Sequence, residues 1–141
     1  MTAPLYTPEI LRLAGSLPEP RALAAVHGSA ERRSPACGSV VALDLALDAQ
    51  GRIAALSQRV QACAFGQASA ALLGRHAPGR TRDEVEAATE AFAGWLAGEH
   101  DDAGFWPGIA ALEPARSRRS RHGAMLLPFR ALVAAFEGAR C

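Results

Sequence analysis

The sequence predicts an α+β fold in which a small antiparallel sheet of about three strands packs against several helices. Three observations support this prediction: residues 43–62 have the pattern of a β-hairpin, helical patterns flank the hairpin on both sides, and no internal repeat or low-complexity linker divides the chain. With 141 residues, 50% of them hydrophobic, the chain is long enough to bury a core. We therefore expect a single domain over residues 1–141.

The N-terminal segment predicts a short helix followed by a long loop. Thr7 is a suitable N-cap, and Pro8 suits the first helical position because that position needs no amide donor. The apolar stripe of this helix would consist of Ile10, Leu11 and Leu13. We expect the helix to end at Gly15 and a loop to continue to Pro35.

The hairpin is indicated by strict alternation of apolar and other residues. In the first strand Leu43, Leu45 and Leu47 alternate with Asp44, Ala46 and Asp48. This is the period of a strand with one buried and one solvated face. Residues 48–51 have turn composition, and residues 52–62 return as the second strand.

Helical patterns fill the rest of the chain. An Ala- and Leu-rich helix is predicted over 66–76, and a capping-box sequence at Thr81–Glu84 opens a longer one that extends to Gly98. A short helix is expected over 109–112, and a last helix from Pro128 to Gly138. Between these two lies a basic run that we expect to be a loop, either solvated or facing an acidic partner: Arg116, Arg118, Arg119 and Arg121. The expected aromatic core residues are Phe92, Trp95, Phe129 and Phe136.

Composition excludes several classes of function. A formal net charge of +1 and only 6% aromatic residues do not suggest nucleic-acid binding. No apolar run approaches the length of about 20 residues that spans a bilayer, and the N-terminus lacks the pattern of a signal peptide. We therefore expect a cytoplasmic protein without a membrane partner. The three cysteines, an odd and small number, argue against a disulfide framework and for thiols used as ligands or nucleophiles.

Two of the cysteines are predicted to lie opposite each other. A short turn at 48–51 pairs residues whose numbers add up to about 99 or 100, as those of Cys37 and Cys63 do. Facing β-carbons lie about 5 Å apart, so two thiolates there could share a metal ion or a cluster. A bulge at Gly51 would slip this register by one residue.

The residues around the two cysteines agree with a ligand role. Cys37 lies between Pro35 and Gly38, and Cys63 precedes a helix whose N-terminal dipole favours a thiolate. The alternative is that both are buried apolar cysteines, and a disulfide is geometrically possible although unfavoured in the cytosol.

At this point the chain resembles a known family, the iron-sulfur cluster assembly scaffolds of the IscU, SufU and NifU N-terminal type. The likeness includes Tyr6 and the first helix, Pro35-Ala36-Cys37-Gly38 leading into a strand, the turn at 48–51, and Cys63 with Ala68-Ser69-Ala70 behind it. It implies a site at one end of the sheet, where a cysteine desulfurase delivers sulfur and a [2Fe-2S] cluster is built from iron and passed on. Some relatives instead hold zinc and accept sulfur from the desulfurase.

The chain departs from that family at three places. Ser39 stands where the family usually has Asp, no third cysteine precedes the last helix, and a recognition stretch for a specialised chaperone is replaced by residues 115–120. The family's histidine beside the third cysteine corresponds to His122. The resemblance therefore implies a ligand set of Cys37, Cys63 and His122, which suits zinc with a water, or a [2Fe-2S] centre with one histidine. Cys141 follows the last helix and is left out of the set.

The sequence thus predicts a scaffold-like protein that binds iron or a [2Fe-2S] cluster and transfers it to apo acceptor proteins, and that is not an enzyme. Two alternatives remain open: a zinc-bound sulfur acceptor for a cysteine desulfurase, and a degenerate adaptor without a cluster. We expect a monomer or a weak homo-oligomer. A Cys–His hydrolase fits poorly, because no nucleophile elbow and no orienting acid near His122 can be placed.

Overall fold

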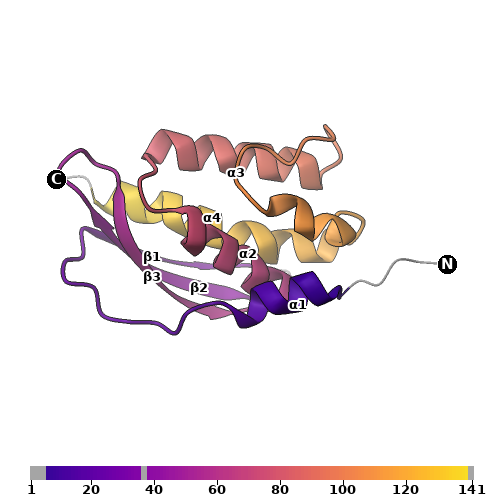
Figure 1. The fold of residues 1–141 in the computed structure, drawn as a ribbon, viewed down its shortest axis with the longest axis horizontal. Helices are drawn as coiled ribbons and strands as arrows, with labels where there is room; N and C mark the ends of the chain where they lie inside the picture. The colour runs from indigo at the N-terminus through magenta and orange to yellow at the C-terminus, as the bar shows by residue number, and fades with distance from the viewer. Residues whose placement is uncertain (1–5, 36–37, 140–141) are drawn as a thin grey trace.

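A computed structural model describes residues 6–35 and 38–139 of the chain. It contains a three-stranded antiparallel sheet with helices packed on one face, which confirms the predicted α+β class (Figure 1). In the described part of the chain, no helix is long and apolar enough to cross a membrane.

The first helix, α1 (Pro8–Gly15), forms where the sequence predicts it. The Thr7 hydroxyl accepts a hydrogen bond from the Ile10 amide at 3.1 Å, which satisfies one of the free amides at the helix start. Ile10 and Leu13 are buried, whereas Leu11 is 52% exposed. The expected apolar stripe is therefore wrong at Leu11, which lies on the outer face of the helix.

The sheet consists of β1 (Gly28–Arg33), β2 (Val40–Leu47) and β3 (Ile53–Gln61), in the order β1-β2-β3. The loop predicted before Pro35 is wrong where it covers β1. This strand has no apolar alternation because it packs its backbone on α4: Gly28 lies directly against the carbonyl of Ala135. A side chain at Gly28 would collide with α4, so the strand carries a glycine where an apolar residue would have revealed it.

The register between β2 and β3 differs by one residue from the predicted one over most of its length. Partners from Val40↔Gln61 to Ala46↔Ala55 have numbers that add up to 101, and the sum is 100 only at Leu47↔Ile53. A bulge in β3 between Ala46 and Leu47 of the partner strand is the cause, because one extra residue shifts the pairing beyond it. The predicted register is therefore wrong over most of the described ladder, whereas the predicted facing of Cys37 and Cys63 stays a prediction. Cys37 itself lies outside the described residues, and the ladder ends at Val40 and Gln61.

The second half of the chain is helical: α2 (Ala64–His76), α3 (Arg82–Leu96), the 3₁₀ helix η1 (Ile109–Ala115) and α4 (Arg119–Gly138). Two predicted boundaries are wrong. Helix α2 starts two residues earlier, and α4 starts nine residues before Pro128, so part of the basic run is helical. The prolyl ring removes one helical hydrogen bond, but Pro128 is buried inside α4 and tertiary packing outweighs that loss.

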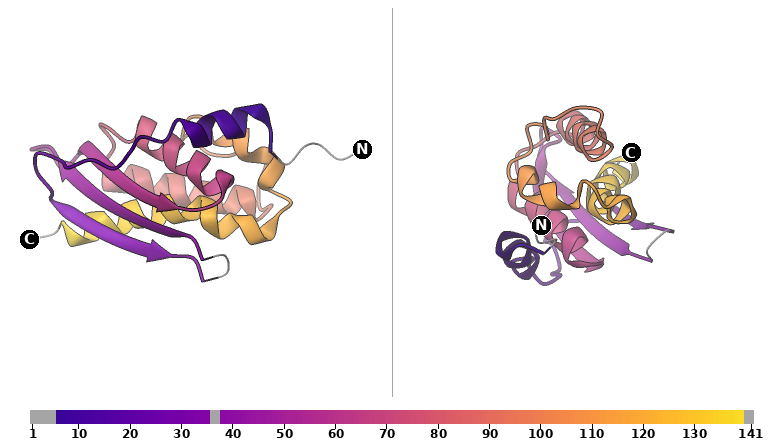
Figure 2. Two further views of the ribbon diagram at one scale, coloured as in Figure 1. Left: turned by 90° about the horizontal axis from the view of Figure 1, so that it is seen from below. Right: turned by 90° about the vertical axis from the view of Figure 1, so that its right-hand side faces the viewer.

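Helices α2 and α4 lie on the sheet, and α3 lies outside α4 (Figures 1 and 2). The core between these layers includes all four predicted aromatic residues, each at most 5% exposed: Phe92, Trp95, Phe129 and Phe136. Phe129 packs edge-on against Phe92 and Trp106, with ring centroids 5.4 and 5.3 Å apart. This packing fixes α4, which carries one of the predicted site residues at its start.

Candidate functional site

Three chain segments meet at the end of the sheet where β1 ends, β2 begins and β3 ends: the loop around Ser34 and Ser39, the start of α2 at Cys63, and the first turns of α4 around His122. Figure 2 shows this end of the β1–β2 hairpin on the same side of the molecule as the start of α4. These are the segments that carry the three predicted ligands.

The loop between β1 and β2 is closed by backbone hydrogen bonds. The Ser34 amide donates to the Ser39 carbonyl, and the Gly38 amide donates to the Ser34 carbonyl, both at 2.9 Å. Gly38 has a φ of 72°, a left-handed conformation that favours glycine. Cys37 lies within this loop, outside the described residues, so its side chain has no structural description. The fixed ends of the loop nevertheless hold Ser34 and Ser39, both buried, beside the site.

Cys63 is the N-cap residue of α2. Its backbone is extended and its side chain makes no capping hydrogen bond, so the thiol is not used to satisfy the helix start. The thiol is free and half-buried. Nearby backbone groups are used locally: the Gln67 side chain donates to the Ala62 carbonyl at 3.0 Å. Cys63 therefore lies at the positive end of the α2 dipole.

Close packing brings the start of α4 against the other two segments. A methyl group on Gly123 would lie 2.9 Å from the Ser34 Oγ, and one on Gly66 would lie 3.2 Å from the Ala124 carbonyl oxygen. Because these glycines have no side chains, the three segments approach closely. The structure thus places the start of α4 against both the Ser34 end of the loop and the start of α2. The site itself and the ligand roles of its residues remain predictions.

His122 is half-buried in the second turn of α4 and is held by one hydrogen bond. Its Nε2 lies 2.8 Å from the Arg116 carbonyl oxygen. A carbonyl only accepts, so Nε2 donates and Nδ1 is left as the nitrogen with a lone pair when the ring is neutral. A ligating histidine usually donates its other N–H to such a carbonyl. Over residues 6–35 and 38–139, no three His, Cys, Asp or Glu side chains gather into a metal site, which leaves the ligand set dependent on Cys37.

Two contacts that the sequence reasoning missed support the site from behind. The buried Ser69 hydroxyl donates to the Met125 carbonyl at 2.6 Å and ties α2 to α4. Tyr6 stacks on Phe65 with ring centroids 5.0 Å apart, which brings the N-terminal segment against α2 next to Cys63. A lone serine in an alanine-rich helix is the only sequence signal for the first contact.

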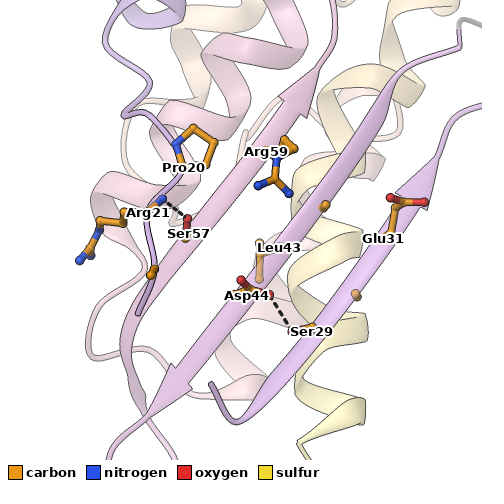
Figure 3. A pocket seen from close by; sticks show the side chains of 11 residues that line it. Pro20, Arg21, Ser29, Glu31, Leu43, Asp44, Ser57 and Arg59 are labelled. Atoms are coloured by element: carbon orange, nitrogen blue, oxygen red, sulfur yellow. Dashed lines mark hydrogen bonds between the residues drawn. The ribbon is translucent and has the colours of Figure 1, made fainter. Parts of the chain in front are cut away.

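A second concave region lies on the opposite, solvent-facing side of the sheet, with a volume of about 580 Å³ (Figure 3). Its polar groups are largely engaged within the fold. The Ser29 hydroxyl donates to Asp44 at 2.7 Å, and the Arg21 amide donates to the Ser57 hydroxyl at 2.9 Å. It contains no cysteine or histidine among its lining residues, so it does not extend the thiol site.

Comparisons with known proteins were made for the sequence and for the structure. No family model and no curated protein matches the chain. A NifU-like N-terminal protein from Brucella abortus, titled as nitrogen-fixing, is similar over 96% of this chain and 94% of its own, with 31% identity and a TM-score of 0.87. A structure titled as a putative iron-sulfur cluster assembly scaffold of the SUF system from Fervidobacterium islandicum covers 94% and 96% of the two chains, with 20% identity and a TM-score of 0.84.

Proposed function

The chain belongs to the family of NifU-like N-terminal proteins, and we propose that it serves as an iron-sulfur cluster assembly scaffold that holds iron or a [2Fe-2S] cluster and passes it to apo acceptor proteins. The observation that carries this proposal is the meeting of the Ser34–Ser39 loop, Cys63 and His122 at one end of the sheet. The solved relative titled as an assembly scaffold supports the same role.

In this proposal Cys37 and Cys63 supply thiolates and His122 supplies Nδ1. Thiolates are soft ligands suited to iron-sulfur clusters, and a histidine replaces cysteine at one iron in some [2Fe-2S] centres. The cluster is cargo, so its ligands must release it. The family's usual set has three cysteines and an aspartate. A set with only two thiolates and a neutral Ser39 in the site loop carries less negative charge, which suits a weakly held cargo.

Sulfur would come from a cysteine desulfurase that carries a persulfide. The thiolate of Cys63 or Cys37 attacks the outer sulfur, the bond between the two donor sulfurs breaks, and the donor cysteine leaves as a thiolate. Electrons balance within this exchange, so no oxidant or reductant is needed. The chain itself catalyses no reaction, and we expect it to act in the cytoplasm.

A second candidate function follows from the lack of a third cysteine beside His122. Two cysteines, one histidine and a water form a common zinc set, so the chain would then be a zinc-bound sulfur acceptor for the desulfurase. The hydrogen bond from His122 to the Arg116 carbonyl leaves Nδ1 to bind zinc in this set, as it does for iron in the first.

Anaerobic reconstitution tests these functions. With iron, cysteine, a desulfurase and a thiol reductant that reduces the transferred sulfur to sulfide, the wild-type chain should develop a charge-transfer spectrum in the visible range and bind iron and sulfide. Cys37→Ala and Cys63→Ala should each lose most of the signal and His122→Ala should lose part of it, whereas Cys141→Ala should match wild type. Stoichiometric zinc without a cluster would favour the second function, and equal spectra in all variants would reject the ligand assignment.

A further inference from the structure

The start of α4 carries three arginines, Arg118, Arg119 and Arg121, which we call the basic cluster. Arg118 is the N-cap residue of the helix, and the other two lie in its first turn. Arg118 and Arg119 are exposed and Arg121 is half-buried. The cluster therefore presents charge to solvent at the end of the molecule that holds the candidate site.

The charge of the basic cluster is not neutralised by its surroundings. Among the residues that the structure describes, no acidic side chain lies within ion-pair distance of these three guanidinium groups. Other arginines in the fold do have such partners: Arg82, for example, contacts Glu86 at 2.9 Å and Glu137 at 3.3 Å. The first turn of α4 contains no acidic residue either.

The helix itself adds to this positive charge. The N-terminus of an α-helix carries the positive end of the dipole, where cations are unfavourable and anions are favourable. The basic cluster thus lowers the stability of α4, and the side chain of Arg118 provides no capping hydrogen bond in return. A stability argument does not explain these residues.

The basic cluster borders the candidate site. His122 follows Arg121 directly and is bonded to the Arg116 carbonyl, and Gly123 contacts Ser34 in the site loop. The basic cluster and the candidate site therefore lie at the same end of the molecule.

On the basis of the proposed function, we propose that the basic cluster is the docking surface for an acidic patch on the cysteine desulfurase that donates sulfur. Its positive potential attracts an anionic persulfide and its carrier. The same potential would retain an anionic cluster and thus oppose its departure, which favours the sulfur donor over the cluster recipient as the partner. The chain's net charge of +1 makes the attraction local to this surface.

Charge reversal tests the proposal. The partner in this test is a desulfurase that binds the wild-type chain. At low salt, the double variant Arg118→Glu/Arg119→Glu should associate with it at least about tenfold more slowly than wild type does. Raising the salt concentration should slow wild-type association steeply and that of the variant little. The matched control is Arg21→Glu/Arg130→Glu, which changes the net charge equally at exposed arginines away from the site, and it should stay within about twofold of wild type.

Two further measurements separate docking from folding and from cluster chemistry. The variant should melt no lower than wild type, because glutamate suits a helix start, and its reconstitution with iron and free sulfide should be unchanged. If the variant binds the desulfurase like wild type, with the same salt dependence, the docking surface is wrong while the scaffold function stands. If only transfer to an apo acceptor slows, the surface belongs to the recipient and the proposal is overturned. If wild type binds no desulfurase and assembles no cluster, the proposed function itself fails.

Discussion

Helices α3 and α4 begin in opposite ways. At the start of α3 the Thr81 hydroxyl accepts from the Glu84 amide, and the Glu84 carboxylate accepts from the Thr81 amide, at 3.2 and 3.1 Å. Asp83 and Glu84 also face the positive end of that helix dipole. The bond from the Thr81 amide is the main cause that lowers the pKa of Glu84 below its ordinary value. Helix α4 has no capping side chain at its start and has arginines where α3 has acids.

The capped and the uncapped helix starts lie at opposite ends of the sheet. Helix α3 starts beside the β2–β3 turn, where the Ile53 amide donates to the Arg80 carbonyl. Helices α2 and α4 both start at the site end, and neither has a side-chain cap or an acidic residue in its first turn. Two helix starts without side-chain caps therefore lie at the end of the sheet that carries Cys63, while the distant start is built for stability. We take this as the electrostatic signature of a site that handles anions.

Removing the cap of α3 should give the largest change in stability. Thr81→Ala deletes the capping hydroxyl, and we expect the free energy of unfolding to fall by about 1–2 kcal/mol. Thermal unfolding followed by circular dichroism would measure it. Cluster assembly by the folded variant should be unchanged, because α3 starts far from the site. A loss of assembly at temperatures well below the midpoint would contradict the division between the two ends.

Adding a cap to α2 should raise the stability of the protein, whereas removing the cap of α3 lowers it. Cys63→Ser places a hydroxyl at the N-cap and should raise the free energy of unfolding by about 0.5–1 kcal/mol, while it removes one of the two proposed sulfur acceptors. Denaturant unfolding and persulfide labelling would report the two effects. Cys141→Ser is the matched control and should alter neither. A less stable Cys63→Ser variant would show that the thiol packs as a core group and would weaken the comparison.

A residue at the C-terminal end of α2 should give the smallest change in stability. His76 ends this helix, and burial, with the charges of Arg75 and Arg80, lowers its pKa below 6.5. The unfolded chain therefore binds a proton more readily, so stability should decrease as the pH falls from about 6.5 toward the lowered value. Unfolding curves across this range should show a slope that His76→Gln abolishes and Arg75→Gln reduces only partly, since burial is the larger cause. An unchanged slope in His76→Gln would show that another group is responsible.

The elements with strong local signals were predictable from the sequence. The Thr7 cap and the Thr81–Glu84 capping box form as predicted, and the hairpin forms with a shifted register, because their signals are local and their packing agrees with them. The early start of α4 could not be predicted, since Pro128 is a strong stop signal that only the surrounding core overrides. The bulge that shifts the β2–β3 register is likewise set by packing of the whole sheet.

The candidate site was predictable in its segments but not in its fine structure. Cys63 and His122 were found through their sequence motifs, and the structure brings their segments together. The contacts that hold these segments, at Gly66, Gly123 and Ser69, join residues more than 50 positions apart in sequence or leave no side chain to read. The predicted register of β2 and β3 is wrong because turn geometry alone does not account for a bulge, and the facing of Cys37 and Cys63 falls on a residue outside the described ones.

Strand β1 also determines how the edge of the sheet meets other polypeptides. It lies at the edge of the sheet and ends in Glu31, Arg32 and Arg33, all exposed. A free edge is a template on which another polypeptide can add a strand, and charged residues oppose such pairing. The charged residues at the end of β1 should therefore protect the protein from edge-to-edge aggregation, so that the half-buried thiol of Cys63 can be reached at one end without the sheet recruiting a neighbour along its side.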